Sequence, residues 1–146
     1  MQRNVRGTTD SELLFHLVLS FLHDAGHLDA PAPREQIVTA AIRSAVALVD
    51  RLCAEVKAPT SQINMVLTEG RTMYALRRGG PMAYVERRGI HDADIDEPPS
   101  RTKPTMLRYV MVVAEDVGEL AADWHSLESG ELLVVDRQLD VHRHAS

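Results

Sequence analysis

The sequence predicts an α+β fold in which two N-terminal helices are followed by a mostly antiparallel sheet. Helical spacing of apolar residues before Pro59, alternation of apolar and polar residues after it, and glycine-containing turns between the alternating runs all favour this fold. The chain has 146 residues, of which 45% are hydrophobic and 25% charged, as is typical of one globular domain. One hydrophobic core is therefore the default expectation for residues 1–146.

The first part of the chain is expected to be helical. Apolar residues at three- and four-residue spacing line one face of a helix from about Asp10 to Asp24, and Gly26 follows as a residue that can end it. After a proline-containing loop, a second helix is expected over residues 34 to about 57. Its apolar stripe is wide, so we expect much of this helix to be buried, with Cys53 as a small core residue.

The rest of the chain is expected to form about six strands. Those strands are predicted at residues 63–68, 72–77, 82–86, 107–114, 131–136 and 139–142. The first two and the last two are expected to be hairpins. Residues 107–114 are almost continuously apolar, which indicates a central strand. Residues 91–104 are polar and contain three prolines, so we expect a surface loop there.

Charge and cysteine content exclude several classes of function. Sixteen Lys and Arg residues against 21 Asp and Glu residues give a net charge of −5, which provides no basic excess for nucleic-acid binding. The single cysteine excludes an intrachain disulfide, a four-cysteine zinc site and a CxxC redox pair. Because no segment approaches the roughly 20 apolar residues that span a bilayer, we expect a cytoplasmic protein without membrane contact.

Two groups of side chains were considered as metal ligands. His23 and His27 are four residues apart, but a glycine that ends helices lies between them. The three aspartates of residues 92–96 alternate as in a calcium loop, but Glu97 and Lys103 occupy the positions that need a flexible Gly and a bidentate Glu. The sequence also lacks a glycine-rich phosphate loop. We therefore expect neither a metal nor another cofactor.

The start of the first helix allows two interpretations. Thr9 can be the N-cap and Glu12 its capping-box partner, an arrangement that stabilises a helix by about 1 kcal/mol. In the same geometry, Asp10 can hold a substrate ammonium group if its carboxylate faces a cleft. The residues alone favour the structural interpretation.

Three segments, taken in order, resemble the class II glutamine amidotransferases, and most closely the single-domain type related to the ergothioneine-pathway amidohydrolase. Residues 7–15 resemble the Thr-Asp-Ser-Glu helix start of that family. Residues 63–77 resemble its Asn-containing strand, its Glu-Gly turn and its Ala-Leu-Arg strand. Residues 112–132, including Trp124 and the Ser-Gly-Glu-Leu run, resemble its last block. The resemblance covers most of the chain.

This resemblance implies an N-terminal-nucleophile fold, an α/β/β/α sandwich of two antiparallel sheets between helical layers. Family members hydrolyse glutamine or a γ-glutamyl amide and use an N-terminal cysteine as the nucleophile. This chain begins with Met1 and Gln2 and has no counterpart of the nucleophile half. We therefore expect an incomplete sandwich, the C-terminal part of the domain, with no catalytic residue. Asp10 is the one functional residue that carries over, as the aspartate that binds the substrate α-amino group.

The resemblance leaves two functions open. The chain can be part of an amidotransferase or amidohydrolase that is inactive alone and acts on glutamine or a γ-glutamyl small molecule. It can instead be a non-catalytic domain derived from that fold, which binds a ligand or a partner subunit. In both cases a half-sandwich exposes sheet edges and apolar faces, which favour self-association or pairing with a separate chain that carries the nucleophile half.

Overall fold

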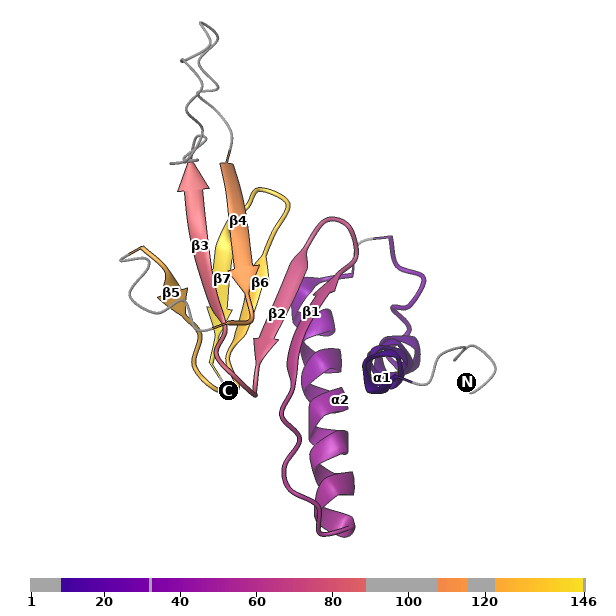
Figure 1. Cartoon of the computed structure of the whole chain (residues 1–146). Coiled ribbons are helices and arrows are strands. Elements are labelled where there is room, and N and C mark those ends of the chain that lie inside the picture. Colours follow the sequence, from indigo (N-terminus) through magenta and orange to yellow (C-terminus); the bar gives the residue numbers. More distant parts are fainter. Residues whose placement is uncertain (1–8, 32, 89–107, 116–122, 146) are drawn as a thin grey trace, which may run out of the picture. The chain divides into compact units, whose positions relative to one another are not determined.

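The computed structural model describes residues 9–31, 33–88, 108–115 and 123–145 in two compact units (Figure 1). The first unit ends at Ser61 and holds α1 (Asp10–Asp24) and α2 (Glu35–Glu55). The second unit begins at Gln62 and holds the strands. The predicted α+β class, with helices first and antiparallel strands after them, is thereby confirmed.

The helix α1 begins and ends where the sequence predicts. The Thr9 hydroxyl accepts a hydrogen bond from the Glu12 N–H at 3.3 Å, which satisfies one of the free amides at the helix start. Gly26 adopts a φ of +74°, a conformation that side chains disfavour, and its N–H donates to the His23 carbonyl at 2.8 Å. The N-cap interpretation of Thr9 and the helix-ending role of Gly26 are therefore confirmed.

The helix α2 is slightly shorter than expected and is buried only in its first half. The buried residues of α2 are Val38, Thr39, Ala41, Ile42, Ala45 and Val46. Leu52 is 50% exposed and Val56 is 75% exposed, so the expected burial does not extend to the last turns. Figure 1 shows α1 end-on and α2 lengthwise, so the two helices cross steeply and α1 covers only part of α2. Cys53 is half-buried.

The strands of the second unit form two antiparallel sheets. One sheet has the order β1-β2-β6-β7 and the other has the order β4-β3-β5. The first consists of β1 (Asn64–Thr68), β2 (Met73–Arg77), β6 (Leu132–Val135) and β7 (Val141–His144). The second consists of β3 (Ala83–Arg88), β4 (Arg108–Val113) and β5 (His125–Ser126). The predicted hairpins β1–β2 and β6–β7 are both confirmed.

The prediction of a central strand at residues 107–114 is wrong. The strand β4 lies at an edge of the three-stranded sheet and, among the described strands, pairs only with β3. A continuous apolar run indicates burial of both faces of a strand, but it carries no information about its hydrogen-bonding neighbours. The sequence also gave no sign of β5, because two residues are too few to show alternation. The expected loop at 91–104 lies outside the described residues.

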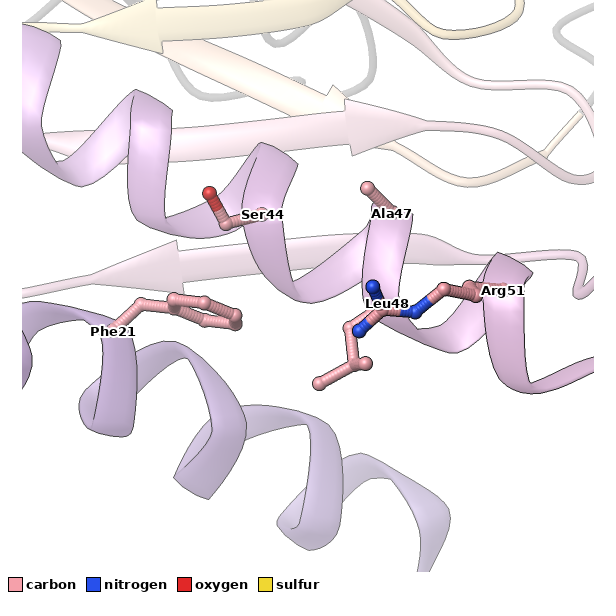
Figure 2. Close-up of a pocket in the computed structure, with 5 residues that line it drawn as sticks. All are labelled: Phe21, Ser44, Ala47, Leu48 and Arg51. Atoms are coloured by element: carbon pink, nitrogen blue, oxygen red, sulfur yellow. The ribbon is translucent and has the colours of Figure 1, made fainter.

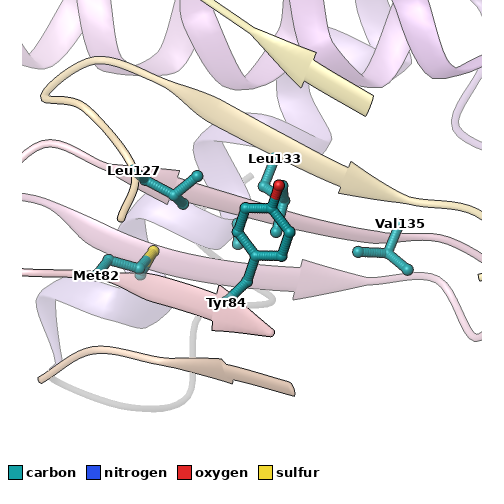
Figure 3. Close-up of a cluster of buried hydrophobic side chains, with 6 residues drawn as sticks. Met82, Tyr84, Leu127, Leu133 and Val135 are labelled. Carbon is teal, nitrogen blue, oxygen red and sulfur yellow. The ribbon is translucent and has the colours of Figure 1, made fainter. Parts of the chain in front are cut away.

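The hydrophobic core of the second unit lies between its two sheets (Figure 3). It consists of Ala75, Met82, Tyr84, Leu127, Leu133 and Val135, all at most 6% exposed. Ala75 and Leu133 come from the four-stranded sheet, whereas Tyr84 comes from the three-stranded sheet. The sheets therefore pack face to face, as the two-sheet arrangement implied by the resemblance requires.

The chain passes from one sheet to the other between β2 and β3, and one side chain holds this crossing. The Asn64 Oδ1 accepts hydrogen bonds from the N–H groups of Arg78 at 3.2 Å and Gly79 at 3.0 Å. The Asn64 Nδ2 donates to the carbonyls of Gly80 at 3.1 Å and Pro81 at 3.3 Å. The Asn64 side chain, which has both donor and acceptor atoms, thus forms hydrogen bonds with four backbone groups of the irregular segment 78–81.

This close approach explains the glycine at position 79. A Cβ at Gly79 would lie 3.2 Å from the Cβ of Gln62 and 3.4 Å from the Asn64 Oδ1. A larger residue would push the crossing away from β1 and lengthen the Asn64 hydrogen bonds. Arg77 supports the same segment, because its Nε donates to the Gly80 carbonyl at 3.2 Å.

We expect Asn64→Ala to lower the free energy of unfolding by about 1–3 kcal/mol, because four hydrogen bonds to an exposed backbone segment are lost together. The measurement is urea denaturation followed by the fluorescence of Trp124, the single tryptophan. The matched control is Gln62→Ala, which keeps the Cβ next to Gly79 and should change stability by less than about 0.5 kcal/mol. Equal effects of the two substitutions would contradict the role given to Asn64.

Candidate functional site

The predicted site residue Asp10 lies in the helical unit, exposed at the first position of α1. Its Oδ1 accepts hydrogen bonds from the Ser11 N–H at 2.8 Å and from the Ser11 hydroxyl at 3.4 Å. These bonds orient the carboxylate at the positive end of the helix dipole, where a negative charge is stabilised. Substrate binding by Asp10 stays a prediction.

Among the described residues of the helical unit, hollows lie between α1 and α2. The smaller one, about 270 Å³, is lined by Phe21, Ser44, Ala47, Leu48 and Arg51 (Figure 2). The larger one, about 400 Å³, is lined by Phe21, Ala25, His27, Gln36, Ile37, Ala40, Ala41 and Ser44. Both linings combine apolar side chains with polar ones, and Asp10 is part of neither.

No metal centre is formed by the described residues. No three His, Cys, Asp or Glu side chains in this part of the chain lie close enough together to hold a metal ion. His23 is in the last turn of α1, with its Nδ1 3.3 Å from the Asp24 Oδ1, and the helix ends before His27. The aspartates at 92–96, together with Glu97 and Lys103, lie outside the described residues. Neither described helix is long and apolar enough to cross a membrane.

Polar side chains gather at one end of the sandwich in the second unit. Asn64 is paired with Arg77 across β1 and β2, and the Arg77 N–H donates to the Glu131 carbonyl at 3.1 Å. Arg143 lies on β7 opposite Leu133. Because side chains alternate along a strand, Arg77, Glu131 and Arg143 share the face of the core residues Ala75 and Leu133. We call Asn64, Arg77, Glu131 and Arg143 the polar end.

The strongest interaction of the polar end is the ion pair between Glu131 and Arg143. The Arg143 Nε lies 2.5 Å from one carboxylate oxygen and its Nη2 lies 2.9 Å from the other, a bidentate geometry. The Glu131 carboxylate also accepts from the Glu128 N–H at 2.6 Å, and Glu131 is only 6% exposed. Hydrogen bonds from Arg143 therefore lower the pKa of Glu131 despite its burial, and the same pair raises the pKa of Arg143.

The polar end also holds the segment that follows β5. The Arg77 Nη1 donates to the Leu127 carbonyl, and the Arg143 Nη2 approaches the Ser126 carbonyl at 3.5 Å. The Tyr84 ring packs on the His125 ring with centroids 5.1 Å apart. Both guanidinium groups thus hold β5 and the residue after it in place, and the single carboxylate of the polar end is bound by Arg143. The geometry supports positioning and recognition of polar groups rather than bond cleavage.

Sequence reasoning selected only Asp10 and missed the Glu131–Arg143 pair. Glu131 belongs to the last of the resembling segments, but its partner follows only from the register of the β6–β7 hairpin. Leu133 is opposite Arg143, so Glu131, two residues earlier on β6, is a diagonal neighbour of Arg143. The exact register of this hairpin, together with the opposite charges of Glu131 and Arg143, is the signal that identifies the pair.

Comparison with known proteins gives a fold but no family. No family model matches the sequence, and no curated protein matches it significantly. Two solved structures match. A glutamine aminotransferase class-II domain protein from Silicibacter pomeroyi has a TM-score of 0.60, 21% identity and coverage of 96% of this chain and 52% of its own. A predicted glutamine amidotransferase from Pseudomonas aeruginosa has a TM-score of 0.63, 21% identity and coverage of 93% and 51%.

These matches establish the fold of this chain. It is an α+β fold of the kind found in glutamine amidotransferase structures, and the chain spans about half the length of the two structures that it matches. The expectation of an amidotransferase-like fold is therefore confirmed. Its activity does not follow from the fold, because one fold can host many functions.

We expect Glu131→Gln to lower the free energy of unfolding at pH 7 by about 1.5–3 kcal/mol, because it removes charge-assisted hydrogen bonds to Arg143. The lowered pKa of Glu131 sets the sign of the pH dependence. The stabilisation is complete above the ordinary glutamate pKa of about 4.3 and is lost as the pH falls through the lower folded-state value.

Urea denaturation of both proteins at pH 7 and at about pH 3 measures this difference, which should shrink at the lower pH. Glu128→Gln is the matched control, because Glu128 contributes its backbone N–H and not its carboxylate to Glu131. A difference that is the same at both pH values would contradict the ion pair as its source.

Proposed function

We propose that this chain forms the C-terminal half of a class II glutamine amidotransferase-like domain, which hydrolyses glutamine or a related γ-glutamyl amide. The observation that carries the proposal is the match of 93–96% of the chain to about half of two structures, one named as a glutamine aminotransferase class-II domain protein and one as a predicted glutamine amidotransferase. The order of the three resembling segments supports it independently. In this proposal further polypeptide, here called the complementing half, supplies the nucleophile.

In this proposal the complementing half carries out the reaction and this chain binds the substrate. The nucleophile of the complementing half attacks the amide carbon, the C–N bond breaks, and the leaving ammonia or amine takes up a proton. Water then hydrolyses the covalent intermediate and releases the acid. This chain contributes binding: Asp10 is exposed, and a carboxylate in that position can form a charge-assisted hydrogen bond with the substrate ammonium group.

Residues 1–146 alone should release no ammonia from glutamine, because the proposal places the nucleophile in the complementing half. The complementing half is sought directly upstream of the coding sequence, as a reading frame that begins with Met-Cys, and is coexpressed with this chain. The pair should release ammonia, measured by a coupled assay, and lose activity when that cysteine is replaced by alanine.

Two outcomes count against the proposal. Ammonia release by the chain alone that persists in Cys53→Ala would place the chemistry elsewhere in this chain. If no such reading frame exists, or if the pair is inactive, the non-catalytic function is the better explanation of the fold.

In the active pair, Asp10→Asn should lower kcat/KM at least about tenfold, because a neutral amide replaces the charged acceptor of the substrate ammonium. The stability of the chain should change by no more than about 0.3–1 kcal/mol, the usual contribution of a charge at the helix start. Thr9→Ala is the matched control next to it, since it should lower stability by about 1 kcal/mol with a smaller effect on kcat/KM. Undiminished activity of Asp10→Asn would show that residues 9–12 only cap the helix.

A further inference from the structure

The strand β4 lacks the features that usually protect a sheet edge. Its six residues include no proline and no glycine, and its one charge, at Arg108, is paired with Asp140 at 3.1 Å. Natural edge strands are commonly shortened, bulged or charged, which prevents pairing with other chains. The edge strand β7 contains His142, Arg143 and His144, and the edge strand β5 has only two residues. The strand β4 therefore has the composition of a central strand in an edge position.

A second observation comes from the neighbouring sheet. Val66 on β1 is paired with Ala75, so both side chains lie on the face of the sheet that carries the core. Ala75 is fully buried, whereas Val66 is 53% exposed. The core face of the four-stranded sheet thus extends beyond the area that the described part of the three-stranded sheet covers.

The two features lie on the same side of the sandwich. Ser126 of β5 is close to Arg143 of β7, with the Arg143 Nη2 3.5 Å from the Ser126 carbonyl. Figure 1 shows β4, at the opposite edge of its sheet, on the side of β2 and β1. A strand added next to β4 would therefore extend the three-stranded sheet toward β1 and toward Val66.

We propose that the edge of β4 that no described strand occupies is the docking site of the complementing half, which adds an extended apolar segment as a further strand and covers Val66. This inference rests on the proposed function. Strand addition draws its affinity from main-chain hydrogen bonds and its specificity from alternate side chains, and β4 offers both. Val66 is exposed on the core face, and Met111, which is 45% exposed, lies on the opposite face of the three-stranded sheet, so alternate side chains of the added segment can contact both.

The comparison structures favour this occupant over a second copy of the chain. About half of each matching structure has no counterpart here, which leaves a polypeptide of similar length to complete the same fold. Pairing of two six-residue β4 edges alone would bury far less than the roughly 1,200 Å² typical of stable interfaces. A complementing half contacts the edge and the core face around Val66 together.

Hydrogen–deuterium exchange of the full chain, alone and in the pair described above, tests the docking site. In the free chain, the β4 amides that face away from β3 should exchange fast, and in the pair their exchange should slow at least tenfold. The β7 amides should not change, which provides the internal control. Slow exchange throughout Arg108–Val113 in the free monomer, or protection that arises from dimerisation of the chain, would overturn the proposal.

Substitutions test the same site by binding. Val66→Lys and Met111→Lys should each weaken the pair at least tenfold, because each places a charge against the added segment. Val56→Lys, at a residue 75% exposed on the helical unit, introduces the same charge and should leave binding unchanged. Circular dichroism of each variant verifies that the chain is folded.

The results separate this inference from the proposed function. An active pair whose β4 exchange and binding are unaffected would overturn the docking site and leave the proposed function intact. A pair with β4 protected but without ammonia release would support the docking site and contradict the proposed function.

Discussion

The crossing between the two sheets sets the geometry of the strand-containing unit, and the Asn64 amide fixes that crossing. Its four hydrogen bonds hold the backbone of residues 78–81 against β1. The chain then enters Met82 and β3, where Tyr84 reaches the core face of the other sheet. A crossing of different shape would change how β3 lies over β2, and every core contact between the sheets depends on that placement.

Polar and apolar interactions have different roles in this arrangement. Burial of each large core side chain contributes about 1.5–3 kcal/mol, whereas a typical hydrogen bond contributes a net 0.5–1.5 kcal/mol. Each large side chain of the cluster around Tyr84 and Leu133 therefore contributes more stability to this unit than a typical hydrogen bond does. Hydrogen bonds are directional, so those of Asn64, Arg77 and the Glu131–Arg143 pair determine which loops meet at one end of the sandwich. Apolar burial is non-directional and does not determine this.

The parts of the fold that depend on local sequence could be predicted, and those that depend on neighbours in space could not. The bounds of α1 followed from Thr9 and Gly26, whose cap geometries are local. The edge position of β4 did not follow, because apolar residues indicate buried faces and not hydrogen-bonding partners. The same limit applied to the polar end, where Glu131 and Arg143 meet only through the register of a hairpin. Asp10 was found through a family resemblance, since its local chemistry is that of a helix cap.

The failed prediction for β4 is itself informative about the molecule. A sequence typical of a central strand is costly at an edge, because it exposes apolar side chains and unpaired backbone groups that favour aggregation. The partly exposed Val66, on a face that is otherwise core, has the same cost. Both features have one explanation if further polypeptide lies alongside β4, and the half-length match to two larger structures is consistent with such a segment. The disagreement between sequence pattern and observed topology thus supports the proposed docking site.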